Sequence, residues 1–323
     1  MSYKYWLKNV SFVIICLFIL FQILLSFKPY LGTNKTEEYV YYKRDWIRSN
    51  IGEKVKNKEN IVVLGDSTIT SGFLPNIFDN ESSFTNTINL SIVDSDAQKH
   101  IYFLKDFIKY NYTPDVIIWN PTVPRSLEYY LNANKNEVFD YYSITDNIQF
   151  LLDYYLPALN SEKIKNIFLS VFKNREEMDN VIKDLEKERG TYYWNGNKNQ
   201  SVGKNFIDND YNSSKSPKLV GTNSEYKKYL FSFLDLAHQL KIKVFIISPP
   251  MMDESSLPLK KIPDIYREME RKYDNVYLSN ILTSTYYPSE LFFDRGHMNY
   301  NGATIYTKDL LNSFIKHTKK QGS

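Results

Sequence analysis

The sequence predicts an α/β fold in which a parallel β-sheet carries helices on both faces. Two observations indicate this class: short apolar runs rich in β-branched residues recur along the chain, and segments with helical spacing of apolar residues separate them. Fully apolar runs are typical of parallel strands, because both faces of such strands are buried. The 323 residues, 43% of them hydrophobic, provide enough apolar material for one large domain with an insertion.

The expected elements alternate regularly. The expected strands are residues 61–64, 88–90, 116–119, 244–247 and 276–278. The first strand ends at Gly65, the third begins after Pro114, and the fourth ends before Pro249. Helical spacing marks residues 97–110, 226–240, 265–273 and 303–317. We therefore expect a three-layer α/β/α domain around a parallel five-stranded sheet.

Residues 140–221 interrupt this alternation between the third and fourth strands. Residues 140–189 have apolar residues spaced at three or four, and residues 190–221 are rich in Gly, Asn, Ser and Lys. Long connections of this kind are usually functional or mobile. We expect a helical insertion that either packs on the domain or forms a lid or a docking surface for a membrane partner.

The N-terminus carries an uncharged apolar segment, residues 10–27. As a helix rising about 1.5 Å per residue, it comes close to the roughly 30 Å hydrocarbon core of a bilayer. Lys4 and Lys8 precede it, which favours a cytoplasmic N-terminus. The rival interpretation is a cleaved signal peptide, although no A-x-A-like site follows the run.

We expect the segment to be a single-pass anchor in contact with membrane lipid. The resulting parts are a cytoplasmic N-terminus, a transmembrane anchor, a stalk and an extracytoplasmic domain, at residues 1–9, 10–27, 28–59 and 60–323.

The charge distribution separates this domain from nucleic-acid-binding proteins. The formal net charge is +3, and the basic residues are scattered among acidic ones, so the basic patch that nucleic acid requires is missing.

Cysteine and histidine content restricts the chemistry. The one cysteine, Cys16, lies in the apolar N-terminal segment, which excludes an intramolecular disulfide and a cysteine-based metal site. The four histidines are dispersed along the chain. Two of them, His100 and His238, fall in expected helices and are interpreted as surface or packing residues. We expect no bound metal and no cofactor.

Two short motifs carry groups suited to nucleophilic catalysis. Ser67 follows the first strand in Gly65-Asp66-Ser67, at the edge where parallel sheets place ligand sites. Asp294 and His297 share one loop near the end of the domain. A serine hydroxyl is a poor nucleophile until an imidazole takes its proton, and a carboxylate fixes the tautomer of that imidazole. We therefore expect a catalytic triad of Ser67, His297 and Asp294, with Asp66 supporting the turn.

These motifs resemble those of the SGNH superfamily, also called GDSL hydrolases, over roughly residues 60–316. The sequence around Ser67 is similar to the nucleophile block of the family. Asp294, three residues before His297, is similar to its last block. The resemblance implies an SGNH-type fold and acyl-ester chemistry through an acyl-enzyme on Ser67.

The resemblance also implies two oxyanion positions. Ser91 follows the second strand, where the family has a glycine, and a backbone N–H there survives the replacement. Asn120 follows the third strand and is similar to the amide donor of the family's Gly-x-Asn-Asp block, although that glycine and aspartate are missing here. Thr122 is the alternative donor. The resemblance therefore implies that Ser91 and Asn120 stabilise the oxyanion, through backbone or side-chain groups.

An anchored SGNH domain outside the cytoplasm is similar to bacterial proteins that O-acylate surface polymers. This likeness implies a cell-surface glycan as substrate and a multi-spanning membrane O-acyltransferase as partner, with the acyl group passed to or removed from the glycan. Two other interpretations stay open. One is an anchored esterase or lipase that acts on small or lipid esters. The other is a non-catalytic SGNH-like accessory scaffold.

The topology gives a first testable prediction. A C-terminal fusion to a reporter enzyme that folds only outside the cytoplasm should be active, because Lys4 and Lys8 hold the N-terminus inside. The same fusion without residues 10–27 is the control and should be inactive. Intact-mass measurement of the mature chain should find residues 1–9 retained. A C-terminal reporter that works only inside the cytoplasm would contradict the topology.

Overall fold

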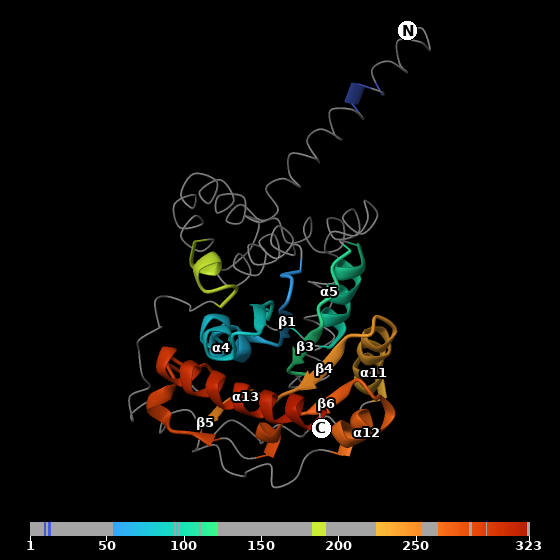
Figure 1. Ribbon diagram of the computed structural model, residues 1–323. Coiled ribbons are helices and arrows are strands. Elements are labelled where there is room, and N and C mark those ends of the chain that lie inside the picture. Colours follow the sequence, from blue (N-terminus) through green and yellow to red (C-terminus); the bar gives the residue numbers. More distant parts are fainter. Residues whose placement is uncertain are drawn as a thin grey trace.

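The parallel sheet expected from the sequence is present and has five strands (Figure 1). Their order across the sheet is β2-β1-β3-β4-β6, and each neighbouring pair is parallel. The strands are β1 (Glu59–Leu64), β2 (Thr85–Asn89), β3 (Val116–Trp119), β4 (Lys243–Ile246) and β6 (Val276–Leu278). The α/β class and the five predicted strands are therefore confirmed.

The computed structural model describes residues 10, 12–13, 54–93, 95, 97–109, 111–121, 183–191, 224–252, 264–283, 286–294 and 296–321. The expected anchor lies outside these ranges except for Val10, Phe12 and Val13, which are helical and exposed. The expected stalk lies outside them up to residue 53. Within the described ranges, no helix is both long and apolar enough to span a bilayer.

Helices cover both faces of the sheet, because alternate residues of a strand point to opposite sides. In β1, Ile61 and Val63 face one side while Val62 and Leu64 face the other, and all four are fully buried. The first side is covered by α3 (Ser67–Gly72), α4 (Pro75–Ser82) and α13 (Tyr300–Gln321). The second is covered by α5 (Ala97–Lys109), α11 (Ser224–Gln239) and α12 (Asp264–Lys272). Figure 1 shows these two layers on either side of the strands.

Several short elements are not indicated by the sequence pattern. They are α3, α4, the parallel pair β5 (Met251–Met252) and β7 (Tyr286–Tyr287), and the 3-10 turns η6 (Asn280–Thr283) and η7 (Ser289–Leu291). Helix α3 consists mainly of Ser, Thr and Gly, which have low helix propensity. It forms because Asp66 caps its first turn and because Ile69 is fully buried against the sheet.

The strand order places a topological switch point between β1 and β3. The chain leaves β1 toward β2 on one side and later returns to β3 on the other side of β1. In open parallel sheets, ligands bind outside the carboxyl ends of the strands at such a point. The turn after β1, which begins at Gly65, and Asn120 after β3 both lie at this edge.

The described end of the insertion is fixed to the domain. Residues 183–187 are helical, and Arg189 forms an ion pair with Asp79 of α4. The carbonyl of Lys187 accepts a hydrogen bond from Asn76 at 2.9 Å, and the Thr191 hydroxyl donates to the Phe73 carbonyl at 2.6 Å. This end therefore packs on α4 and on edge strand β2. The remainder of the expected insertion lies outside the described residues.

The start of α13 gives a stability prediction. A Cβ placed on Gly302 would overlap the backbone carbonyl of Leu291 and lie 3.0 Å from the Leu291 Cβ. Gly302→Ala should therefore lower the free energy of unfolding by about 1–3 kcal/mol, because backbone has to shift. Thermal unfolding of the full chain measures the effect. Asn301→Ala, an exposed change one residue earlier, is the control. A Gly302→Ala midpoint equal to that of wild type would refute the clash.

Candidate functional site

The predicted nucleophile lies in a tight turn at the carboxyl end of β1. Gly65 is buried, and an ideal Cβ on it would lie 2.7 Å from Ile69 Cγ1 and 3.2 Å from Asn120 Cβ. A side chain at this position therefore has no room. Ser67 follows as the first residue of α3 and is partly exposed. The turn thus brings Ser67 to the edge of the sheet where a substrate can reach it.

Asp66 organises this turn. Its Oδ1 accepts hydrogen bonds from the backbone N–H of Thr68 at 3.0 Å and from the Thr68 hydroxyl at 2.5 Å. Its backbone carbonyl accepts from the N–H of Ile69 and Thr70 at 3.2 and 3.0 Å. Because the Asp66 carboxylate accepts both of these bonds from Thr68, it holds the first turn of α3 in place. This geometry fits the supporting role that the sequence predicts for Asp66.

Asp294 and His297 form a hydrogen-bonded pair on the loop before α13. His297 Nδ1 lies 2.8 Å from both carboxylate oxygens of Asp294. Oδ1 of Asp294 also accepts the backbone N–H groups of Gly296 and His297, each at 2.9 Å. The Phe293 ring stacks on the imidazole, with 5.6 Å between centroids. Since Nδ1–H donates to the carboxylate, Nε2 is the nitrogen that can take a proton.

The surroundings of Asp294 keep it ionised. Burial acts to raise the pKa of Asp294, but the hydrogen bond and charge of His297 and the backbone N–H groups of Gly296 and His297 outweigh it, so the pKa is lowered from its ordinary 3.8. The stabilising contribution of this carboxylate is therefore fully present above pH 3.8 and is lost as the pH falls through the lower folded-state pKa. Above that range Asp294 is the anion that orients His297.

The two motifs, more than two hundred residues apart in the chain, meet at the same edge of the sheet. An ideal Cβ on Gly296 would lie 4.0 Å from Cγ2 of Thr68, the residue after Ser67. Helix α13, which follows the loop, packs against α3 and α4. On α13, burial and then the charge of Asp66 raise the pKa of the Tyr306 hydroxyl. The fold thus brings the loop of Asp294 and His297 against the first turn of α3.

The predicted oxyanion residues lie at the ends of β2 and β3. Ser91 and Asn120 are buried, at 0% and 2% exposure. The Ser91 N–H donates to Asn89 Oδ1 at 3.0 Å, and the Asn120 N–H donates to the Leu64 carbonyl at 2.8 Å. Within the described part of the chain, the Ser91 hydroxyl has no hydrogen-bond partner. These two backbone N–H groups are thus engaged internally. Thr122 lies outside the described residues.

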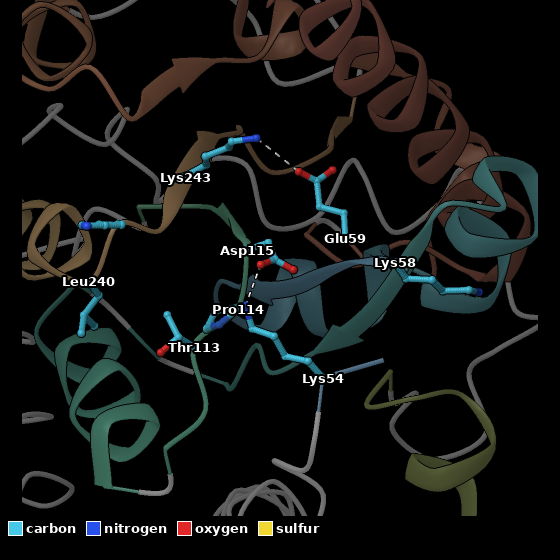
Figure 2. A pocket seen from close by; sticks show the side chains of 9 residues that line it. Lys54, Lys58, Glu59, Thr113, Pro114, Asp115, Leu240 and Lys243 are labelled. Atoms are coloured by element: carbon cyan, nitrogen blue, oxygen red, sulfur yellow. Dashed lines mark hydrogen bonds and ion pairs between the residues drawn. The ribbon is translucent and has the colours of Figure 1, made fainter. Parts of the chain in front are cut away.

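A cavity of about 570 Å³ lies at the opposite edge of the sheet (Figure 2). Its lining comprises Lys54, Lys58, Glu59, Thr113, Pro114, Asp115, Leu240, Lys241 and Lys243. Ion pairs join Lys54 to Asp115 at 2.6 Å and Lys243 to Glu59 at 3.5 Å. These residues stand where β1, β3 and β4 begin, whereas Ser67 follows the end of β1. The cavity is therefore separate from the candidate active site.

The sequence did not indicate the hydrogen bonds of one buried polar residue near the site. His100, interpreted as a surface or packing residue, is fully buried and hydrogen-bonded through both ring nitrogens. The spacing of Ala97, His100, Leu104 and Phe107 places the ring on the buried face of α5, and this pattern was the available signal. Among the described residues, no cluster of three or more His, Cys, Asp or Glu side chains is arranged to hold a metal ion.

Comparison of the sequence with protein-family models and with curated proteins finds no match. Among solved structures, the chain is similar to a Bacteroides fragilis NCTC 9343 protein described provisionally as an acylhydrolase. The two chains share 10% sequence identity with a TM-score of 0.38, over 90% of this chain and 99% of the other. The chemistry of the candidate site is therefore inferred from its own residues.

Proposed function

We propose that this chain is a serine-dependent acyl-ester hydrolase or O-acyltransferase of the SGNH type, with Ser67, His297 and Asp294 as its catalytic triad. One observation carries the proposal. The hydrogen-bonded Asp294–His297 pair lies on a loop packed against the residue that follows Ser67, at the switch point of a parallel sheet. A nucleophile, a base and a group that orients the base are the minimum set for acyl transfer through a covalent intermediate.

The reaction follows from these roles. Ser67 Oγ attacks the ester carbonyl carbon while His297 Nε2 takes the hydroxyl proton. The tetrahedral intermediate collapses, the bond to the leaving alcohol breaks, and His297 returns the proton to that alcohol. Water or an acceptor alcohol then attacks the acyl-enzyme, again with His297 as base, and restores the Ser67 hydroxyl. The Asp294 carboxylate stabilises the imidazolium that forms in each half of the reaction.

The oxyanion needs donors at the same edge of the sheet. The Ser91 hydroxyl and the Asn120 side chain are the groups we assign to it, since their backbone N–H groups are engaged within the protein. Loss of one such donor typically costs about 3 kcal/mol of transition-state stabilisation. The hydroxyl of Ser91 suits this role because it is buried without a partner among the described residues and can rotate toward a developing charge.

We further propose that the enzyme acts outside the cytoplasm on a cell-surface glycan, beside a multi-spanning membrane O-acyltransferase. The uncharged run at residues 10–27, with Lys4 and Lys8 before it, supports a membrane anchor and this orientation. An anchored esterase acting on small or lipid esters is the second candidate, because the same triad serves both. Glycan analysis of a deletion strain distinguishes them: altered O-acylation supports the first, and an unchanged glycan with lost esterase activity supports the second.

Covalent labelling tests the nucleophile. We predict that a fluorophosphonate probe labels the full chain at Ser67, because a serine activated by an imidazole is phosphonylated quickly. Ser67→Ala should abolish labelling. Ser313→Ala, a change at a buried serine of α13 that is bonded to Ser279, is the matched control and should retain it. Peptide mass spectrometry locates the label. Labelling that persists in Ser67→Ala would overturn the assignment, and an unlabelled wild type would favour a non-catalytic scaffold.

Turnover of a chromogenic short-chain ester tests the acid–base pair. Asp294→Asn should lower kcat on the order of 10³- to 10⁴-fold, because the amide no longer holds the required tautomer of His297. The double variant Asp294→Ala/His297→Ala should lose about as much kcat as His297→Ala alone, since the two residues act as a unit.

Asp115→Asn supplies the matched control for these variants. Asp115 also accepts hydrogen bonds, from Lys54 and from the Asn60 N–H, but it lies at the amino edge of the sheet. Its replacement should lower stability and leave kcat unchanged. Independent, multiplicative losses in the double variant, or a loss in Asp115→Asn equal to that in Asp294→Asn, would show that Asp294 and His297 do not work as a catalytic pair.

A further inference from the structure

A chain of hydrogen bonds lies behind the nucleophile turn, on the face of the sheet that α5 and α11 cover. The indole Nε1 of Trp119 lies 2.9 Å from Nδ1 of His100, and Nε2 of His100 lies 3.0 Å from the Ser95 hydroxyl. The Ser95 hydroxyl donates in turn to the backbone carbonyl of Gly65. This series of hydrogen bonds therefore ends at Gly65, the residue that opens the Gly65-Asp66-Ser67 turn.

The direction of every bond in this chain is fixed by its chemistry. An indole N–H can only donate, so Nδ1 of His100 must accept and carries no proton. The proton of the neutral ring is then on Nε2 and points to the Ser95 hydroxyl. Because that hydroxyl accepts from His100, its own proton is free to be donated to the Gly65 carbonyl, which only accepts. The three groups thus form a one-way series from Trp119 to Gly65.

Burial makes this series rigid. The side chains of Trp119 and His100 are fully buried, and Ser95 is 2% exposed. The Trp119 ring stacks on Phe233 with 4.1 Å between centroids and 24° between planes. The rings of His100 and Phe233 meet nearly edge to face, with 6.3 Å between centroids. A buried polar group that loses its partner is costly, so each member of the series holds its neighbour in place.

We propose that His100 and Ser95 are positioning residues that set the orientation of the nucleophile turn; this inference rests on the proposed function. The Gly65 carbonyl is held from this side by Ser95 and by the N–H of Ile92 at 3.0 Å. The peptide that carries this carbonyl leads directly into Asp66 and Ser67, so its plane sets the path of the turn.

The series also joins the parts of the chain that are assigned to catalysis. Trp119 directly precedes Asn120, and Ser95 follows the segment that contains Ser91. The series therefore ties the ends of β1 and β3 and the segment after β2 into one unit. Catalysis depends on reacting groups held at fixed distances, and a displacement of about 1 Å can cost on the order of a hundredfold in rate. A purely structural contact would have no such effect on reactivity.

The test measures the rate of fluorophosphonate labelling of Ser67 in the full chain. Ser95→Ala should slow labelling roughly tenfold to a hundredfold, and Ser95→Thr, which keeps the hydroxyl, should restore most of it. His100→Leu should slow labelling while leaving Ser95 in place. Ser313→Ala is the matched control: Ser313 is a buried serine bonded to Ser279 at 3.0 Å and to the Asn280 N–H at 2.9 Å, away from the turn. It should lose stability but keep the wild-type labelling rate.

The outcomes separate this inference from the proposed function. An unlabelled wild type, or label that survives Ser67→Ala, counts against the proposed function. Labelling of Ser67 at the wild-type rate in folded Ser95→Ala, or an equal loss in Ser313→Ala, overturns the positioning role alone. Where Ser95→Ala does not fold, side-chain ¹⁵N resonances of histidine in the wild type decide. His100 protonated on Nε2 and bare on Nδ1 supports the series, and the opposite tautomer overturns it.

Discussion

Gly65 stands where β1, α3 and the end of β3 meet, and the candidate site depends on the closeness of that meeting. A Cβ there would lie 2.7 Å from Ile69 and 3.2 Å from Asn120, so only glycine lets the three backbones approach. The carbonyl of the same residue accepts two hydrogen bonds from the segment after β2, from Ser95 and from Ile92. One small residue therefore joins the ends of β1 and β3 and the segment after β2, beside the proposed nucleophile Ser67.

The two layers of helices have different tasks around this point. The α13 side carries the Asp294–His297 loop and packs it against the start of α3. The α5 and α11 side carries no catalytic group in our assignment, but it holds the Gly65 carbonyl through Ser95 and His100. The sheet between them is buried on both faces. A displacement of one helix layer is therefore transmitted to the strands, because the interior is closely packed. The site is thus supported from both layers at once.

The charge of Asp294 completes the arrangement on the side of the sheet that α13 covers. Asp294 is about two-fifths exposed, with 40% of its side chain accessible, yet hydrogen bonds from His297 and Gly296 keep its pKa low. Burial acts to raise this pKa, but the hydrogen bonds and the charge of His297 outweigh it, so the carboxylate stays charged. His297, with 24% of its side chain accessible, lies on the loop that packs against the first turn of α3.

The sequence by itself determined the α/β class, the five parallel strands and their flanking helices, because apolar runs and periodic spacing are local properties of the chain. It also indicated Ser67, Asp294 and His297, because short spacings within a motif survive without knowledge of the fold. The short helix α3 escaped prediction, since its Ser, Thr and Gly residues favour helix only when capped and buried.

Tertiary structure alone decided the contacts between segments that are distant in the chain. It placed the Asp294–His297 loop against Thr68, and it engaged the Ser91 N–H with the side chain of Asn89. It also revealed that His100 links Trp119 to Ser95. A hydrogen bond depends on the distance and direction between two atoms, and spacing along a chain does not specify these until packing has brought the segments together.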